Sequence, residues 1–307
     1  MHNQQLNTDM NLKLQGRFRL MVRNKETDEV VRDTGWFENL ILDAGLNRMG
    51  TGAPISGCAI GTGTSTPTVS DTGLQSLAAW TTTTTTSTGY GNEGAPNYVS
   101  FYECGYRFNA GSLNGNYAEI GMGWGSTTMF SRARIVDGLG NPTTISVLST
   151  EYLDVFYMLR VIPDLNTYTS SVVVSGITYS VDRKPANVSS TSVWRPLYNG
   201  AVTWVGGQSG SYPVILTNGS LGAVTGSPSG TTQYPSANTT SGTYVGNSYE
   251  RTGSFTIGLA SGNLAGGIKS VQVLGTMCSY QFEFTPALPK DNTKQLVLNG
   301  KVTWARV

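Results

Sequence analysis

Apolar and polar side chains alternate along three stretches of the chain, near residues 12–23, 280–285 and 296–304. The apolar positions are Leu12, Leu14, Phe18, Leu20 and Val22 in the first stretch, Tyr280, Phe282 and Phe284 in the second, and Leu296, Leu298, Val302 and Trp304 in the third. Polar residues such as Arg17, Gln281 and Lys301 lie between them. Because successive side chains of a strand point to opposite faces of a sheet, this alternation predicts antiparallel strands with one face buried and the other exposed.

Two other segments have different patterns. Residues 152–163 are apolar on both faces, which predicts a central strand that is covered on both sides. Asn39 is a suitable N-cap for a helix over residues 40–49, and Gly50 would end that helix. We therefore expect an all-β protein with an antiparallel β-sandwich architecture and one short helix near residues 39–49.

The composition of the chain changes near residues 163–166. This change predicts two packed β domains, an N-terminal one over residues 1–165 and a C-terminal one over residues 166–307. Residues 81–96 and 206–246 are rich in Gly, Ser and Thr and have few apolar anchors, so we expect them to form long loops. A deletion from Gln208 to Val224 should accordingly leave the core folded.

The overall composition narrows the possible functions. The chain of 307 residues is 38% hydrophobic and 13% charged, with a formal net charge of +1. The charged fraction is about half of the ~25% that is usual in soluble domains, so copies of the chain would repel each other weakly. A net charge this small provides no electrostatic footprint for a nucleic acid.

Targeting signals are also missing from the sequence. It contains no run of ~18 apolar residues, so we expect no membrane span. Residues 1–5 include no basic region followed by an apolar one, so we expect no secretory signal. Synthesis and folding in a cytosol fit the three cysteines, Cys58, Cys104 and Cys278, which show no C-x-x-C spacing. We expect them to be buried thiols and not a disulfide framework.

Residues that could carry catalysis are few. The only histidine is His2, at the N-terminus, which argues against histidine-dependent catalysis and histidine-rich metal sites. Paired carboxylates remain, because most glycosidases need only two. The candidates are Glu103, Glu119, Asp137, Glu151 and Asp154.

Glu119 is the strongest of these candidates. It lies near Trp124, as a carboxylate in a sugar site would, but the interpretation that we favour is a polar residue on an exposed strand face. No spacing shows which two carboxylates would face each other. We therefore assign no catalytic, cofactor-binding or metal-ligating residue, and we expect the protein not to be an enzyme.

A set of short motifs is spread along the chain. Residues 35–46 end in Asn-Leu-Ile-Leu-Asp-Ala-Gly-Leu and are followed by residues 58–67, which contain a Gly-Thr-Gly sequence, and by Asp71 and Thr72. Further motifs lie at residues 118–121, 130–133, 141–145, 151–155, 280–282, 286, 289–290 and 302–306. In combination these motifs resemble those of bacteriophage tail structural proteins, and the resemblance covers nearly the whole chain except residues 81–96 and 206–246. It implies a β-rich, multi-copy virion protein and provides no catalytic residues.

The resemblance implies a structural component of a bacteriophage virion, located in the tail as a fibre, tip, collar or baseplate accessory. A capsid decoration protein is one alternative, and a receptor- or glycan-binding module of the tail is another. The expected partners are other copies of the chain and other tail proteins, together with a host receptor or glycan in the last alternative. Neither a cofactor nor a nucleic acid is expected.

Overall fold

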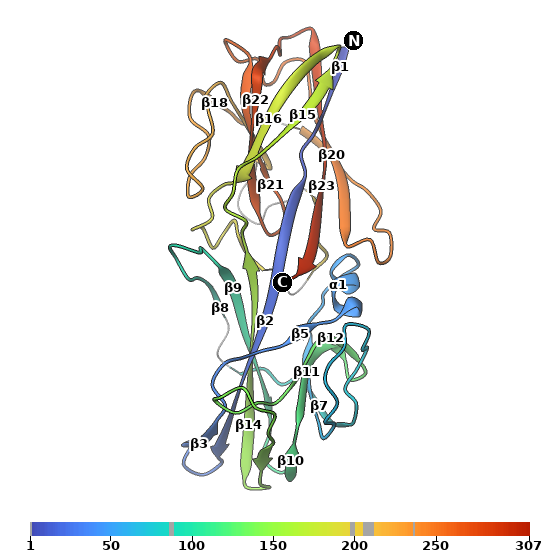
Figure 1. The fold of residues 1–307 in the computed structure, drawn as a ribbon, viewed down its shortest axis with the longest axis vertical. Helices are drawn as coiled ribbons and strands as arrows, with labels where there is room; N and C mark the ends of the chain where they lie inside the picture. Colours follow the sequence, from blue (N-terminus) through green and yellow to red (C-terminus); the bar gives the residue numbers. More distant parts are fainter. Residues whose placement is uncertain (1, 86–88, 197–199, 205–211, 236) are drawn as a thin grey trace.

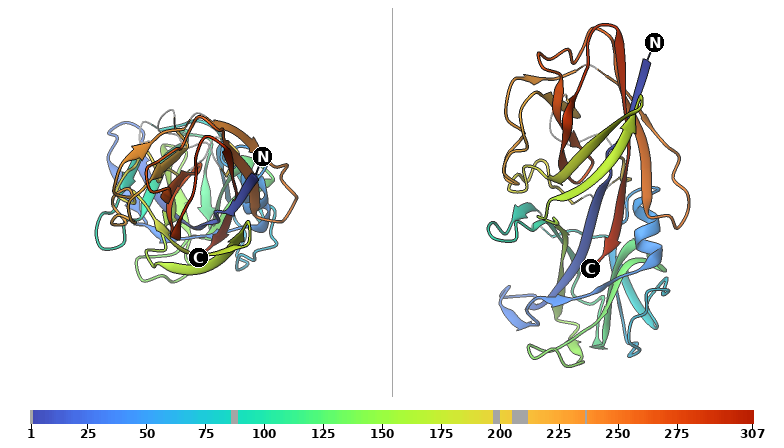
Figure 2. Two further views of the ribbon diagram at one scale, coloured as in Figure 1. Left: turned by 90° about the horizontal axis from the view of Figure 1, so that it is seen from above. Right: turned by 45° about the horizontal axis from the view of Figure 1, so that its top comes forward.

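The computed structural model describes residues 2–85, 89–196, 200–204, 212–235 and 237–307. Within these ranges the chain forms 23 strands and one short helix, α1 (Asp43–Met49). The molecule is elongated, and one large sheet runs along its long axis with a smaller sheet packed against it in each half (Figures 1 and 2). The predicted all-β sandwich architecture is therefore confirmed.

A ten-stranded sheet runs through both halves of the molecule. Its main path is β19 (Ala237–Ser241), β20 (Glu250–Ile257), β23 (Lys294–Arg306), β2 (Met10–Asn24), β14 (Glu151–Ile162), β9 (Ser100–Phe108) and β8 (Gly89–Asn92). In addition, β1 (His2–Asn7) pairs with β23, and β3 (Val30–Asp33) and β4 (Phe37–Glu38) pair with β2.

Strand β2 connects the two halves. Residues 10–14 pair with β23, whereas residues 13–24 pair with β14. The boundary predicted at residues 165–166 falls after β14. The large sheet nevertheless contains strands from both sides of this boundary, because β2 pairs with β14 of the N-terminal half and with β23 of the C-terminal half. Whether the halves are separate domains therefore stays a prediction.

Smaller sheets cover the large one. In the N-terminal half the order is β5 (Leu40–Ile41), β12 (Thr128–Arg134), β11 (Glu119–Gly125), β6 (Gly57–Gly61) and β7 (Leu77–Thr81), with a separate pair β10 (Gly115–Tyr117) and β13 (Ile145–Val147). In the C-terminal half it is β15 (Tyr168–Val174), β16 (Ile177–Pro185), β22 (Ser279–Leu288), β21 (Ile268–Leu274), β17 (Val214–Thr217) and β18 (Thr232–Gln233). Most buried apolar side chains of both halves belong to one contiguous cluster, and Leu42, Ala59 and Met129 form a small separate one.

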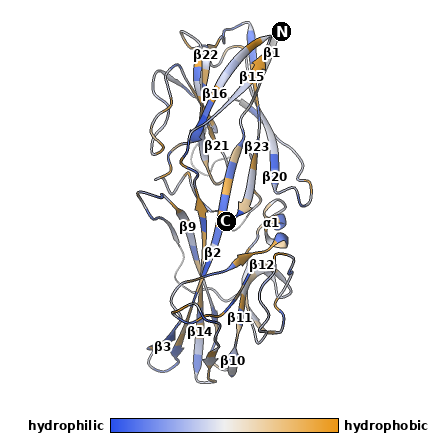
Figure 3. Cartoon of the chain, viewed as in Figure 1, coloured by the Kyte–Doolittle hydropathy of each residue, from blue (hydrophilic) through white to orange (hydrophobic). Residues whose placement is uncertain are grey.

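The alternating patterns identify the buried faces correctly. All twelve apolar positions of the three stretches are at most 3% exposed. Figure 3 shows the corresponding alternation of hydrophilic and hydrophobic residues along β2. As expected, β14 is central, between β2 and β9, and is largely buried on both faces.

The C-terminal strand β23 is paired within the sheet, as its apolar face predicts. It lies between β20 on one side and β1 and β2 on the other. The indole Nε1 of Trp304 donates a hydrogen bond to the carbonyl oxygen of Leu46, at 2.8 Å. Its pairings with β1 and β2 are parallel, whereas the other strand pairings of the described residues are antiparallel.

The helix is shorter than predicted. Leu40 and Ile41 form β5 and pair with β12, and the helix begins only after Leu42, which makes no side-chain cap hydrogen bond. Asn39 is not the cap, because its amide donates to the hydroxyl of Ser131 at 3.1 Å. Pairing with a distant strand thus overrides the local helical pattern at these residues.

The two predicted loops are wrong in part. Strand β8 lies within residues 81–96, and β17, β18 and β19 lie within residues 206–246; residues 86–88, 205–211 and 236 are outside the described part of the chain. Val214 and Leu216 of β17 are fully buried and pair with β21. A deletion from Gln208 to Val224 would remove the core strand β17, so the structure argues against the expectation that the core would stay folded.

Candidate functional site

Glu119 and Arg132 form a buried ion pair in the smaller sheet of the N-terminal half. Glu119 is the first residue of β11, Arg132 lies on the neighbouring strand β12, and their side chains are 0% and 3% exposed. The Oε2 atom of Glu119 lies 3.0 Å from Nε and 2.9 Å from Nη2 of Arg132. The prediction that Glu119 is a polar residue on an exposed strand face is therefore wrong.

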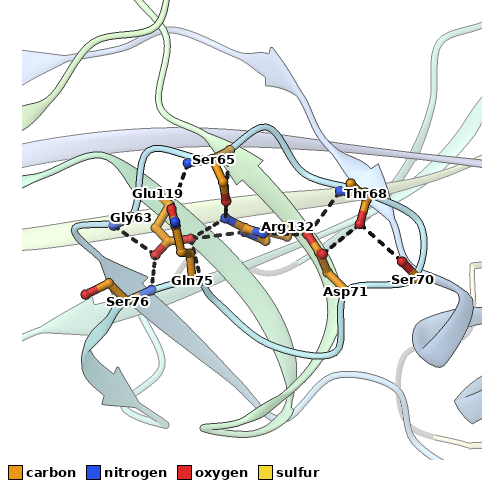
Figure 4. A network of polar contacts seen from close by, with 9 residues as sticks. All are labelled: Gly63, Ser65, Thr68, Ser70, Asp71, Gln75, Ser76, Glu119 and Arg132. Carbon is orange, nitrogen blue, oxygen red and sulfur yellow. Dashed lines mark hydrogen bonds and ion pairs between the residues drawn. The ribbon is translucent and has the colours of Figure 1, made fainter.

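Three backbone N–H groups donate to the same carboxylate (Figure 4). The Oε1 atom of Glu119 accepts from Gly63 at 3.0 Å and Ser76 at 2.7 Å, and Oε2 accepts from Gln75 at 3.0 Å. Together with the guanidinium, these donors occupy the roughly four lone-pair sites of a carboxylate. Glu119 thus attaches both ends of the segment 62–76 to the sheet.

The close approach of Glu119 explains why the Gly-Thr-Gly sequence of this segment has glycine at both positions. A Cβ atom on Gly63 would lie 2.3 Å from the Oε1 atom of Glu119. A Cβ atom on Gly61 would lie 2.7 Å from the same oxygen and 2.4 Å from the carbonyl oxygen of Ser76. Any larger residue would push the carboxylate away from its donors, so both positions require glycine.

Asp71 binds the other side of Arg132. The two side chains form an ion pair, and the guanidinium Nη2 also donates to the hydroxyl of Ser65 at 2.8 Å. Asp71 in turn accepts hydrogen bonds from the backbone N–H and the hydroxyl of Thr68, at 3.0 and 2.7 Å. Burial raises the pKa of Asp71, but the hydrogen bonds from Thr68 and Arg132 outweigh this and hold the pKa below its ordinary value.

A groove of about 550 Å³ lies beside the ion pair. Its lining consists of Ser65, Ser70, Asp71, Thr72, Gly73, Leu74, Gln75, Leu77, Ser126, Thr127 and Arg132. A general base needs a free lone pair within reach of its substrate, and the acceptor sites of the adjacent Glu119 are taken by the protein itself. The geometry therefore favours a role for Glu119 in holding the structure together.

The other candidate carboxylates lie elsewhere. Asp154 on β14 accepts two hydrogen bonds from Arg107, at 2.6 and 2.8 Å, and lies 3.3 Å from Arg23. Glu151 on the same strand pairs with Arg32. Glu103 lies on β9 in the same large sheet, whereas Glu119 belongs to the smaller one.

Asp137 is part of a tight turn and is exposed. Its carboxylate accepts the backbone N–H groups of Leu139 and Asn141, both at 2.9 Å. The hydrogen bond from Asn141 is the main reason that the pKa of Asp137 is lowered. Its role is therefore to stabilise the turn, like an Asx residue in other turns.

The three cysteines are free and buried, as expected. Burial raises the pKa of each thiol, for Cys104 to about 12. Among the described residues there is no cluster of three or more His, Cys, Asp or Glu side chains arranged to hold a metal ion. No helix in the described part of the chain is long and apolar enough to cross a bilayer.

Several of the motifs singled out in the sequence are neighbours in space, whereas residues 280–282, 286 and 289–290 lie in or directly after β22 of the C-terminal half. Segments 58–67, 118–121 and 130–133 and Asp71 supply the network just described. Residues 35–46 pack against it, and a Cβ atom on Gly45 would lie 2.2 Å from the carbonyl oxygen of Phe130. At the chain end, Trp304 and Arg306 donate to the carbonyl oxygens of Leu46 and Ile41.

No protein-family model, curated protein or solved structure matches the chain. The class of protein is therefore described by its fold, a mostly β protein in which one ten-stranded sheet packs against smaller sheets. Any functional interpretation rests on the polar network and on the motifs that form it.

Proposed function

We propose that the chain is a structural subunit of a bacteriophage virion, located in the tail as a fibre, tip, collar or baseplate accessory, and that it is not an enzyme. The observation that carries this proposal is the convergence of the resembling motifs. Residues 35–46, 58–72, 118–133 and 302–306 are far apart in the sequence but form one packed unit. Motifs that recur among proteins because they hold a shared fold should converge in this way.

The chemistry of the unit supports a structural role. The ion pairs and hydrogen bonds of this unit join Glu119, Arg132 and Asp71 to one another and to the backbone of residues 62–76. The other buried carboxylates also form ion pairs with arginines. The low charged fraction of 13% fits a subunit that is packed against other copies and other tail proteins.

Immunogold electron microscopy tests the proposal directly. Antibodies raised against the purified chain should label the tail of particles from the phage that encodes it. Labelling over the capsid surface would instead identify a decoration protein. Absence of both label and chain-derived peptides in the mass spectrum of purified particles would refute a virion role.

Association in solution is a second test. The purified chain should sediment as an oligomer, or should form a complex with another tail protein of the same phage. Sedimentation as a monomer under all conditions, together with no co-purifying tail protein, would contradict the multi-copy interpretation.

A further inference from the structure

The segment of residues 41–50, which contains α1, lies where the two halves of the molecule meet (Figure 1). It belongs to the N-terminal half, where Ile41 pairs with β12. Its other neighbours come from the C-terminal half. They are the loop of residues 242–249, between β19 and β20, and the end of β23. The contacts of residues 41–50 therefore join the two halves to each other.

Asn47 binds the loop between β19 and β20. Its Oδ1 atom accepts hydrogen bonds from the hydroxyl of Tyr244 at 2.9 Å and from the backbone N–H of Asn247 at 2.8 Å. The ring of Tyr244 stacks on that of Trp304, with the ring centres 5.7 Å apart. A Cβ atom on Gly50 would lie 2.3 Å from the Tyr244 ring. The segment and the loop are therefore as close as a glycine permits.

The C-terminal end of α1 depends on the other half for its hydrogen bonds. The last four carbonyl groups of an α-helix have no partner within the helix. Local backbone N–H groups satisfy two of them in α1. The other two belong to Leu46 and Met49, and they accept from the indole Nε1 of Trp304 and from the backbone N–H of Val202, each at 2.8 Å. This short helix is thus completed by residues of the C-terminal half.

Arg251 on β20 joins three segments of the chain. Its guanidinium donates to the carbonyl oxygens of Gly50 and Gly242, each at 2.9 Å, and to that of Val202 at 3.3 Å. Gly50 directly follows α1, whereas the other two acceptors belong to the C-terminal half. One side chain therefore fixes the end of α1 relative to two segments of the other half.

A second contact between the halves lies on the other side of β2 in the strand order. At the end of β8, the side-chain amide of Asn92 donates to the carbonyl oxygen of Val188 at 2.9 Å. The guanidinium carbon of Arg195 lies 3.8 Å from the ring centre of Tyr90 on the same strand. Without the contacts of α1, β2 and this second contact would act together as a hinge.

We propose that residues 41–50 form a latch that joins the two halves into one rigid body. Two units connected by a shared strand are expected to move relative to each other unless an apolar interface holds them. The latch provides one, because Leu46 and Met49 belong to the same apolar cluster as Trp304. The polar contacts then fix the orientation of the halves, so the two ends of the molecule keep a constant distance. This inference does not depend on the proposed virion role.

Differential scanning calorimetry and small-angle X-ray scattering on the full-length chain test the proposal. The wild type should unfold in one transition, with a ratio of calorimetric to van't Hoff enthalpy of about 1. The double variant Asn47→Ala/Arg251→Met should unfold in two transitions, so that this ratio rises well above the wild-type value. Before unfolding, it should have a smaller radius of gyration than the wild type, because bent conformations are shorter than the straight one.

The matched control is Asn218→Ala. The side chain of Asn218 also accepts a backbone N–H, that of Thr231 at 2.8 Å, and donates to the carbonyl oxygen of Ala265 at 3.2 Å. All three residues lie in the C-terminal half, so the substitution leaves the junction intact. This variant should keep a single transition, at a lower temperature than the wild type, and should scatter like the wild type.

Two results would overturn the proposal. One is a wild type that already unfolds in two transitions. The other is a folded double variant that keeps one transition and the wild-type radius of gyration. If the double variant does not fold, the same two measurements on Asn47→Ala alone decide the question, because this substitution removes two hydrogen bonds of a partly exposed side chain and no buried apolar group.

Discussion

The two halves of the molecule bury polar groups of different kinds. Among the described residues, all buried acidic residues and arginines lie in the N-terminal half: Glu119, Arg132, Glu151, Asp154 and Arg160. The C-terminal half buries neutral groups apart from Lys290: Thr217, Ser270, Gln272, Thr276, Ser279 and Gln281. The N-terminal half therefore includes buried ion pairs, whereas the C-terminal half buries mainly uncharged polar groups.

Glu119 and Gln281 show what the difference involves. Each is 0% exposed and holds a covering segment on its sheet. The amide of Gln281 accepts the N–H of Gly222 at 2.8 Å and donates to the carbonyl oxygens of Pro185 and Ala223, at 3.1 and 3.2 Å. A buried amide is neutral and can donate to and accept from backbone groups alone. A buried carboxylate carries a charge and also requires a cation as its partner. The N-terminal half should accordingly be more sensitive to changes of charge.

The largest effect should come from removing the strand that both halves share. Deleting residues 297–307 removes most of β23, which pairs with β20, β1 and β2, so we expect insoluble or unfolded protein. Trp304→Ala alone should cost about 3–5 kcal/mol, since the indole is 2% exposed and bonded to Leu46. A soluble truncation with an unchanged melting temperature would show that β23 is dispensable.

In the N-terminal half, Glu119→Gln should lower the free energy of unfolding by about 3–5 kcal/mol, because it leaves Arg132 buried with a single carboxylate partner. Urea denaturation measures this loss. A loss below about 1 kcal/mol would mean that the ion pair contributes little more than an exposed one. If the chain has the proposed virion role, plating of the phage should change only as far as the stability of the protein does. Loss of polysaccharide cleavage by a stably folded variant would instead indicate an enzymatic function.

In the C-terminal half, Gln281→Leu should cost less, about 1–3 kcal/mol. The substitution leaves the N–H of Gly222 and the carbonyl oxygens of Pro185 and Ala223 without their partner, but it strands no charge. The same urea titration compares it with Glu119→Gln. Equal losses in the two variants would contradict the contrast between the halves.

Acid should weaken the N-terminal half through Asp71. Its pKa in the folded protein lies below the ordinary value of 3.8, so its contribution is present above that value and is lost as the pH falls through the lower folded pKa. The drop in melting temperature between about pH 6 and pH 3 should therefore be smaller for Asp71→Asn than for the wild type. Ser70→Ala, which removes a neighbouring hydroxyl only, should follow the wild-type profile.

The smallest perturbation uses the three buried thiols as reporters. In the folded protein Cys58, Cys104 and Cys278 should not react with a thiol reagent, because they are inaccessible and burial raises the pKa of each. Labelling at increasing urea then reports the opening of each half, with Cys278 in the C-terminal one. Simultaneous labelling of all three indicates one cooperative unit, whereas earlier labelling of either half supports the predicted boundary at residues 165–166.

Residues of the candidate site were only partly predictable. The motif pattern singled out the Gly-Thr-Gly step, Asp71, Glu119 and Arg132, but it gave no reason for their combination. The reason is an ion pair whose backbone donors lie 43 to 56 residues away from Glu119 in the sequence.

The sequence by itself determined which face of each long strand is buried, because alternation is a local property of an extended chain. It also determined the all-β class and the burial of the cysteines. Only the tertiary structure decided which polar residues enter the core. Glu119 and Gln281 occupy positions that alternation assigns to the exposed face, and they are buried because distant segments fold over them and supply hydrogen-bond partners. Tertiary structure also determined where short strands such as β17 form. A segment of a few residues has little strand preference of its own and becomes a strand because it pairs with a neighbouring strand, here β21.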